Sequence, residues 1–128
     1  MNDPGVIFSD SDRPVSDSER NWAVAMHLSL LSLHVVAFLW IVIPIILWLA
    51  KRKESAFLDD HGRETVNFHI SLLIYAGLVT ALSIFTCGVG AVLALPLYAL
   101  GIVGMIMASV SAGKGQYYRY PMCVRLIR

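Results

Sequence analysis

Two long stretches of this chain contain no aspartate, glutamate, lysine or arginine: residues 21–50 and residues 65–113. A water-soluble domain of this size keeps charged side chains on its exposed helix faces, so their absence excludes an ordinary soluble fold. About twenty apolar residues cross the hydrocarbon core of a bilayer. The two stretches therefore provide three or four crossings, and the sequence predicts an integral membrane protein.

The chain also lacks the patterns of the common catalytic sites. It contains no Gly-x-Ser-x-Gly, His-Glu-x-x-His or Cys-x-x-Cys pattern and no phosphate-binding glycine loop. We therefore expect no enzyme, no catalytic residue, and no resident metal or cofactor. The two cysteines, Cys87 and Cys123, lie far apart in the chain on opposite sides of the expected membrane, so we expect no disulfide.

Hydropathy and breaker residues divide the 128 residues, which are 57% hydrophobic, into a tail and one membrane domain. Residues 1–15 are acidic and rich in proline and serine, which predicts a disordered tail. Residues 16–128 form the expected membrane domain, with helices at about 18–34, 39–52, 55–86 and 91–112. Ser16 and Glu19 match a capping box at the first helix. The predicted fold class is an all-α integral membrane protein, a four-helix bundle of two helical hairpins of which the first pair is short.

Residues 21–50 allow two interpretations. As one helix they would be about 45 Å long, more than a bilayer core of about 30 Å, and Pro44 would kink them. As a hairpin they would turn near residues 35–38, where there is no glycine, proline or asparagine. Composition alone leaves both open.

Basic residues gather in residues 51–64 and 114–128, whereas the expected turns near residues 36 and 88 carry none. The positive-inside rule places these two segments on the cytoplasmic side of the inner membrane. A multi-pass protein follows, with a cytoplasmic C-terminus; the N-terminus is cytoplasmic if the first stretch is a hairpin and outside if it is a single span. Anionic lipid headgroups are the expected partners of the basic loop and tail, and nucleic acid is not expected.

Asp60, Glu64, Asn67 and Ser71 are spaced by four, three and four residues, so they share one face of the third helix, and Tyr75 extends this row. One hypothesis makes the row the mouth of a cation or substrate path. The other leaves the carboxylates in water or among headgroups and lets Asn67 and Ser71 bond to a neighbouring helix. The second is favoured, because no charged residue lies deeper than Glu64.

Five further polar side chains are secondary candidates: His27, His34, His61, Arg63 and His69. His27 and His34 lie seven residues apart on one helix face, where they could relay protons or ligate metal with His69. Hydrogen bonding across the bundle is the simpler interpretation. His61 sits among the acids of the 54–64 connection, which could bind a metal but more simply pair with neighbouring charges.

A row of small residues in the fourth helix, Gly104, Ala108 and Ala112, permits close helix packing in lipid. Packing inside the bundle is one use of this row. Contact with a second copy, or with another membrane protein, is the alternative.

Several motifs occur together: residues 18–27, 44–51, 54–64 with the block His-Gly-Arg-Glu, 66–71 with Asn-Phe, and Tyr-Arg-Tyr-Pro at 118–121. Together they resemble a family of small bacterial membrane proteins of unknown function that is related to the Tic-twenty subunit of the chloroplast import machinery. The similarity covers residues 16–128. It implies four helices with both ends cytoplasmic, which favours the hairpin. By analogy it also implies a non-enzymatic scaffold or accessory in membrane-protein traffic. The alternative function is an oligomeric channel or transporter for ions or small solutes, because four helices alone enclose no adequate pore.

Overall fold

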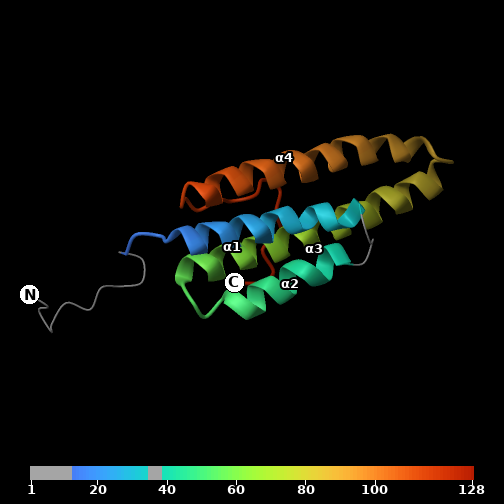
Figure 1. Ribbon diagram of the computed structural model, residues 1–128. Helices are drawn as coiled ribbons and strands as arrows, with labels where there is room; N and C mark the ends of the chain where they lie inside the picture. The colour runs from blue at the N-terminus through green and yellow to red at the C-terminus, as the bar shows by residue number, and fades with distance from the viewer. Residues whose placement is uncertain (1–12, 35–38) are drawn as a thin grey trace, which may run out of the picture.

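The computed structural model describes residues 13–34 and 39–128, apart from the side chains of residues 33 and 34. Over this part the chain is helical and contains no strand (Figure 1). The elements are α1 (Asp17–Leu28), η1 (Ser29–His34), α2 (Leu39–Lys51), α3 (Ala56–Phe85), η2 (Val89–Leu93) and α4 (Ala94–Gly113). The predicted turn at 35–38, and the predicted disordered tail up to residue 12, lie outside the described residues.

The first uncharged stretch forms two antiparallel helices. α1 begins with the predicted capping box, in which the Ser16 side chain accepts from the Glu19 amide and the Glu19 side chain accepts from the Ser16 amide. The chain then tightens into the 3₁₀ helix η1. At the end of α2, Lys51 Nζ lies 4.4 Å from the centre of the Trp22 ring in α1. The two helices therefore return to the same end of the molecule, and the single-span interpretation of residues 21–50 is wrong.

α3 is the longest element, with 30 residues, and Ser55 caps it by accepting a hydrogen bond from the Leu58 amide. At about 1.5 Å per residue it is about 45 Å long. α2 packs closely against its first half, because Gly62 leaves no Cβ and the Trp48 ring occupies that space. The Trp48 indole N–H also donates to Asp59 Oδ1 at 2.8 Å. Every buried residue of α3 lies before residue 73, so its second half stands clear of the bundle.

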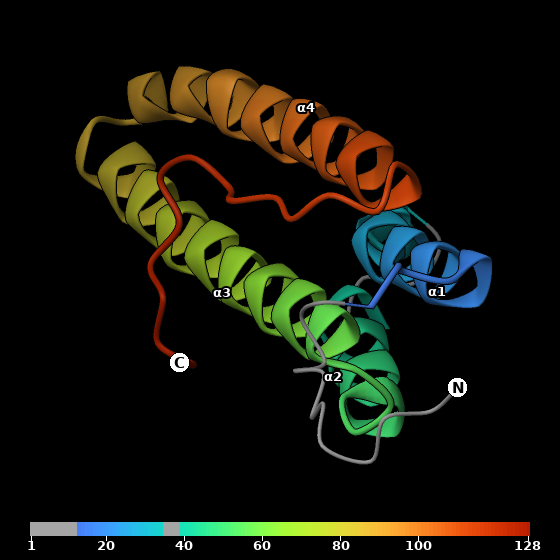
Figure 2. The ribbon, with the colours of Figure 1, turned by 90° about the vertical axis from the view of Figure 1, so that its left-hand side faces the viewer.

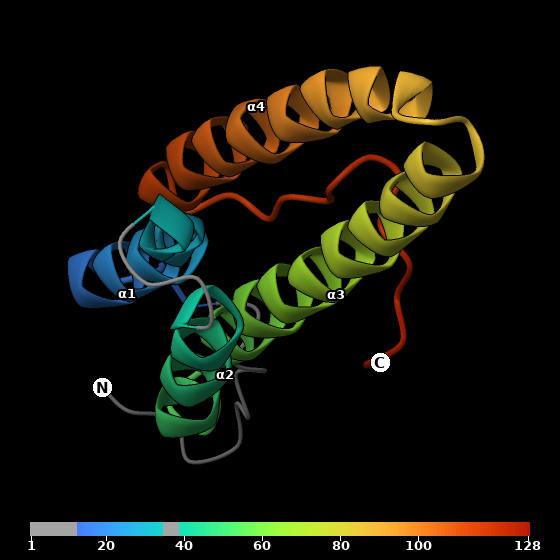
Figure 3. The same cartoon turned by 90° about the vertical axis from the view of Figure 1, so that its right-hand side faces the viewer.

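The predicted glycine turn follows α3. Cys87 and Gly88 have φ of 50° and 95°, and the Thr86 hydroxyl accepts from the Gly90 amide at 2.8 Å. α4 then returns antiparallel to α3. Figures 2 and 3 show that α3 and α4 meet at this turn and diverge toward their other ends, where α1 lies beside α4 and α2 beside α3.

The row of small residues in α4 packs inward. Ala108 and Ala112 are fully buried, and a Cβ on Gly104 would lie 3.1 Å from the Tyr120 ring. The partners of this row are α1, α3 and Tyr120 near the end of the chain, so the row serves packing inside the bundle.

Two helical segments are long and apolar enough to cross a membrane: α3, and the continuous stretch of η2 and α4 (Val89–Gly113). Their exposed side chains in the outer half are large and apolar, among them Leu78, Ile84, Phe85, Val89 and Leu95. The exposed faces of α1 and α2 are apolar as well, with Leu28, Ile46 and Leu49. An exposed apolar surface on this scale is typical of a membrane-associated protein.

Candidate functional site

Residues 116–128, here called the C-terminal segment, fold back along the first half of α3. Figures 2 and 3 show this trace leaving the end of α4 and running between α3 and α4. Tyr120 is buried, and its ring stacks on Phe68 of α3 with centroids 3.8 Å apart. Met122, with a φ of 55°, turns the chain, so that residues 125–127 return toward the start of α3.

Side chains of α3 satisfy the backbone of this irregular segment. Asn67 accepts from the Leu126 and Ile127 amides at 3.1 and 2.8 Å and donates to the Ile127 carbonyl at 2.8 Å. The Ser71 hydroxyl accepts from the Val124 amide at 2.8 Å. The Tyr75 hydroxyl donates to the Met122 carbonyl at 2.6 Å. Irregular backbone has no repeating hydrogen-bond pattern of its own, so these side chains of α3 supply its partners.

Two carboxylates of α3 fix the same segment through arginine. Glu64 accepts from the Tyr120 amide at 2.9 Å and from two nitrogens of Arg125 at 2.8 and 3.1 Å. Asp60 accepts from both terminal nitrogens of Arg119 at 2.6 and 2.7 Å. Both pairs are bidentate, which is the arrangement that holds a guanidinium most firmly.

The four predicted site residues Asp60, Glu64, Asn67 and Ser71 thus lie on one face of α3, with Tyr75 in line; we call these five the α3 polar row. Their partner is neither a neighbouring helix nor open solvent but the chain's own C-terminal segment. One asparagine and one serine, Asn67 and Ser71, lie inside the uncharged part of α3 and signal that some polar partner is needed. The sequence does not identify that partner, because the segment has no helical or strand period.

His27 and His61 form a buried hydrogen-bonded pair, with 2.7 Å between His27 Nε2 and His61 Nδ1. His61 Nε2 lies 3.2 Å from the Gln116 carbonyl, which can only accept, so Nε2 carries a proton. In neutral His61 the Nδ1 atom then accepts from His27 Nε2–H. His27 Nδ1 in turn accepts from the Tyr120 hydroxyl at 2.9 Å. The chain of donors has one direction and joins α1, α3 and the C-terminal segment.

The remaining secondary candidates are not brought together. His69 donates from Nδ1 to the Thr65 carbonyl at 2.7 Å and packs on Trp40, and it forms no hydrogen bond with His27. Its Nε2 is buried without a hydrogen-bond partner among the described residues. Arg63 lies 3.3 Å from Asp59 on the same helix. The side chain of His34 is not among those that the structure describes. The prediction that His27 and His34 share a helix face therefore stays untested.

Every acidic side chain in residues 13–34 and 39–128 forms an ion pair. The pairs are Arg13–Glu19, Arg20–Asp17, Lys51–Glu54, Arg63–Asp59, Arg119–Asp60 and Arg125–Glu64. Asp59, Asp60 and Glu64, which were considered as metal ligands beside His61, therefore each pair with a different arginine. Within the described ranges, no three histidine, cysteine or acidic side chains converge. Both cysteines are free thiols.

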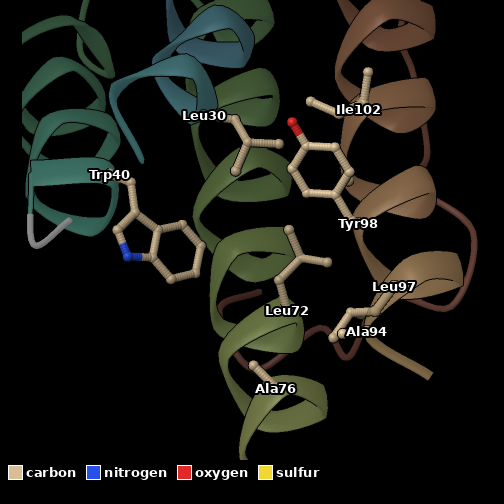
Figure 4. Close-up of a pocket in the computed structure, with 9 residues that line it drawn as sticks. Leu30, Trp40, Leu72, Ala76, Ala94, Leu97, Tyr98 and Ile102 are labelled. Atoms are coloured by element: carbon tan, nitrogen blue, oxygen red, sulfur yellow. The ribbon is translucent and has the colours of Figure 1, made fainter. Parts of the chain in front are cut away.

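An apolar groove opens where α3 and α4 diverge (Figure 4). Small residues leave it unfilled: Ala76 on α3 and Ala94 and Gly101 on α4, with Leu30 and Trp40 on the opposite wall. Its volume is about 250 Å³, and the lining atoms are apolar. The groove therefore presents an apolar surface between α3 and α4.

Comparisons with known proteins were made at three levels. Neither the curated proteins nor the solved structures gave a match to this chain. Among protein families, the model of the magnetosome magnetite crystal formation proteins (MamF/MmsF) matches residues 18–127. The assignment to a Tic-twenty-like family is therefore wrong. Several of the residues on which that resemblance rested, between His61 and Asn67 and at Tyr120, hold the C-terminal segment against α3. Such packing contacts do not specify a function. With the match extending over nearly its whole length, this chain belongs to the magnetosome magnetite crystal formation protein family.

Proposed function

We propose that this chain is an integral protein of the magnetosome membrane and takes part in magnetite crystal formation as a non-enzymatic component. The observation that carries the proposal is the family match over residues 18–127, which includes both long apolar helices. In this arrangement α3 and α4 cross the bilayer as a hairpin. The shorter α1–α2 hairpin enters the bilayer from the end of the molecule that carries the charged residues, here called the polar end. It does not cross the whole bilayer core, because the 13 residues of α2 span only about 20 Å.

The distribution of side chains supports this placement. The charged residues of the described ranges lie at one end of the molecule, around the start of α1, in residues 51–64 and in residues 114–128. The far turn at residues 86–93 carries no charge and satisfies much of its backbone internally, with the Gly88 amide donating to the Ser83 carbonyl at 2.7 Å. By the positive-inside rule the polar end faces the cytoplasm.

The ion pairing of the acids supports an accessory role. A carboxylate that binds iron or a mineral surface uses free oxygen atoms, and each of the six acids of the described residues already has at least one oxygen in contact with a cation. The polar end therefore offers lipids or other proteins a cationic surface. The role in membrane-protein traffic rested on the resemblance that the family match overturned, so it is not part of the proposal. A channel is not favoured either, since the α3 polar row is occupied by the chain itself.

A deletion strain of a magnetosome-forming bacterium tests the proposal. We expect the tagged protein in the purified magnetosome fraction, and crystals of altered size or number in electron micrographs of the deletion strain, restored by the wild-type gene. Normal crystals in the deletion strain, with the protein in another membrane, would contradict it.

A further inference from the structure

A cleft beside the α3 polar row is lined largely by arginine. Its lining residues include Arg63, Arg119, Arg125 and Arg128, together with the carboxylates of Asp60 and Glu64. The volume of the cleft is about 390 Å³. That lies within the range of about 300–1,000 Å³ that is typical of small-molecule sites.

The charge of the lining favours an anion. Its charged side chains are four arginines and two carboxylates, a net charge of +2. The side chains of Arg119 and Arg125 are 52% and 44% exposed, so a ligand can reach them. Arg128 forms no ion pair with any described residue.

Two of these guanidinium groups are already held in position. Arg125 uses Nε and Nη2 on Glu64, which leaves Nη1 to donate to a ligand. Arg119 donates to Asp60 from Nη1 and Nη2, and Nη1 also donates to the Tyr118 carbonyl, which leaves Nε to donate to a ligand. A ligand therefore meets donors whose rotamers are restricted, which lowers the entropy cost of binding. The planar guanidinium group matches the oxygens of a phosphate group.

The position of the cleft identifies the source of the phosphate. Asp60 and Glu64 come directly before the uncharged residues 65–113, so the cleft lies at the depth of the lipid headgroups if α3 crosses the membrane. We propose that this cleft binds the phosphodiester of an anionic phospholipid. Basic pockets at the cytoplasmic ends of membrane helices are suited to such headgroups. The inference rests on the membrane location proposed above.

Native mass spectrometry of the full chain in a neutral detergent tests this inference, with phosphatidylglycerol and phosphatidylcholine of equal chain length as probes. We expect retention of phosphatidylglycerol over phosphatidylcholine. The double variant Arg63→Gln/Arg128→Gln should weaken that retention by about tenfold. The control Lys53→Gln/Lys114→Gln removes the same charge from exposed positions outside the cleft and should retain the lipid. Arg128→Gln alone, which breaks no ion pair, covers the case in which the double variant does not fold.

Three results would overturn the headgroup site. Equal losses in the cleft and control variants would indicate general surface charge, and no loss in either would exclude the cleft. Displacement of phosphatidylglycerol by millimolar inorganic phosphate would make free phosphate the ligand. These outcomes are separate from a failure of the proposed membrane location, which would appear as a chain that stays monodisperse without detergent, and from a failure of the proposed function, which would appear as normal crystals in the deletion strain.

Discussion

Glu19 is a buried carboxylate that holds the start of α1 in place. Its oxygens accept from the Ser16 amide and hydroxyl, both at 2.8 Å, and from Arg13 at 2.6 and 3.1 Å. Burial alone would raise the pKa of Glu19, but hydrogen bonds from Ser55, Ser16 and Arg13 outweigh it and lower the pKa from 4.5 to about 2.

This lowered pKa predicts how stability depends on pH. A carboxyl with a lower pKa in the folded state stabilises the fold above its unfolded pKa of 4.5, and the contribution is lost as the pH falls toward about 2. We expect Glu19 to contribute about 3 kcal/mol of that loss. Melting in detergent at pH 7 and pH 3 should show a smaller shift for Glu19→Gln than for the wild type. An equal shift in both would contradict the assignment.

Asn67 is the residue that fixes the end of the C-terminal segment. Asn67→Leu removes three hydrogen bonds to Leu126 and Ile127 and leaves their backbone groups without partners, at a cost of about 1–3 kcal/mol. We expect a lower melting temperature and faster tryptic cleavage after Arg125. The control is Thr80→Val on the exposed part of α3, where only a hydroxyl bond to the Ala76 carbonyl is lost. Cleavage at the wild-type rate in Asn67→Leu would show that the segment is held by other contacts.

At the scale of elements, the contact of α2 with α3 depends on a single glycine. A Cβ on Gly62 would overlap the Trp48 side chain, which is buried and bonded to Asp59. We expect Gly62→Ala to lower the free energy of unfolding by about 1–3 kcal/mol. Gly77→Ala is the matched control, because nothing lies within 4 Å of a Cβ there. That change should be neutral or stabilise α3 by up to about 1 kcal/mol. Thermal melting in detergent compares the two, and equal effects would contradict the close packing.

The helices could be predicted because their signals are local. The capping box at Ser16, the basic stop at residues 51–53 and the glycines at 88 and 90 place the observed ends of helices within a few residues. The division of residues 21–50 could not be derived from composition. The hairpin follows from tertiary contacts such as Lys51 with Trp22.

The course of the C-terminal segment could not be predicted, for a related reason. Its backbone bonds go to side chains of α3, and no periodic pattern in residues 116–128 indicates this. The pairing of His27 with His61 also escaped prediction, because it depends on the register between α1 and α3. The α3 polar row was visible as a row of residues, but its partner was not.

At the scale of the whole molecule, polarity divides the bundle into two ends. The half that contains α1, α2, the start of α3 and the C-terminal segment holds the charges and the buried polar groups. The other half is an uncharged hairpin of α3 and α4 (Figure 1), and its exposed side chains are mostly large and apolar. The proposed membrane location fits this division, with lipid around the apolar hairpin and headgroups and water at the end that carries the charges.

Thiol accessibility tests most directly whether α3 and α4 cross the membrane. With Cys123→Ser, the exposed Cys87 in the turn between α3 and η2 becomes the only thiol. A second chain carries Lys114→Cys with both native cysteines changed to serine. In intact magnetosomes, a membrane-impermeant maleimide should label Lys114→Cys at once and Cys87 only after detergent lysis. Labelling of both positions in intact magnetosomes would place the two ends of the hairpin on one side of the membrane and contradict the account.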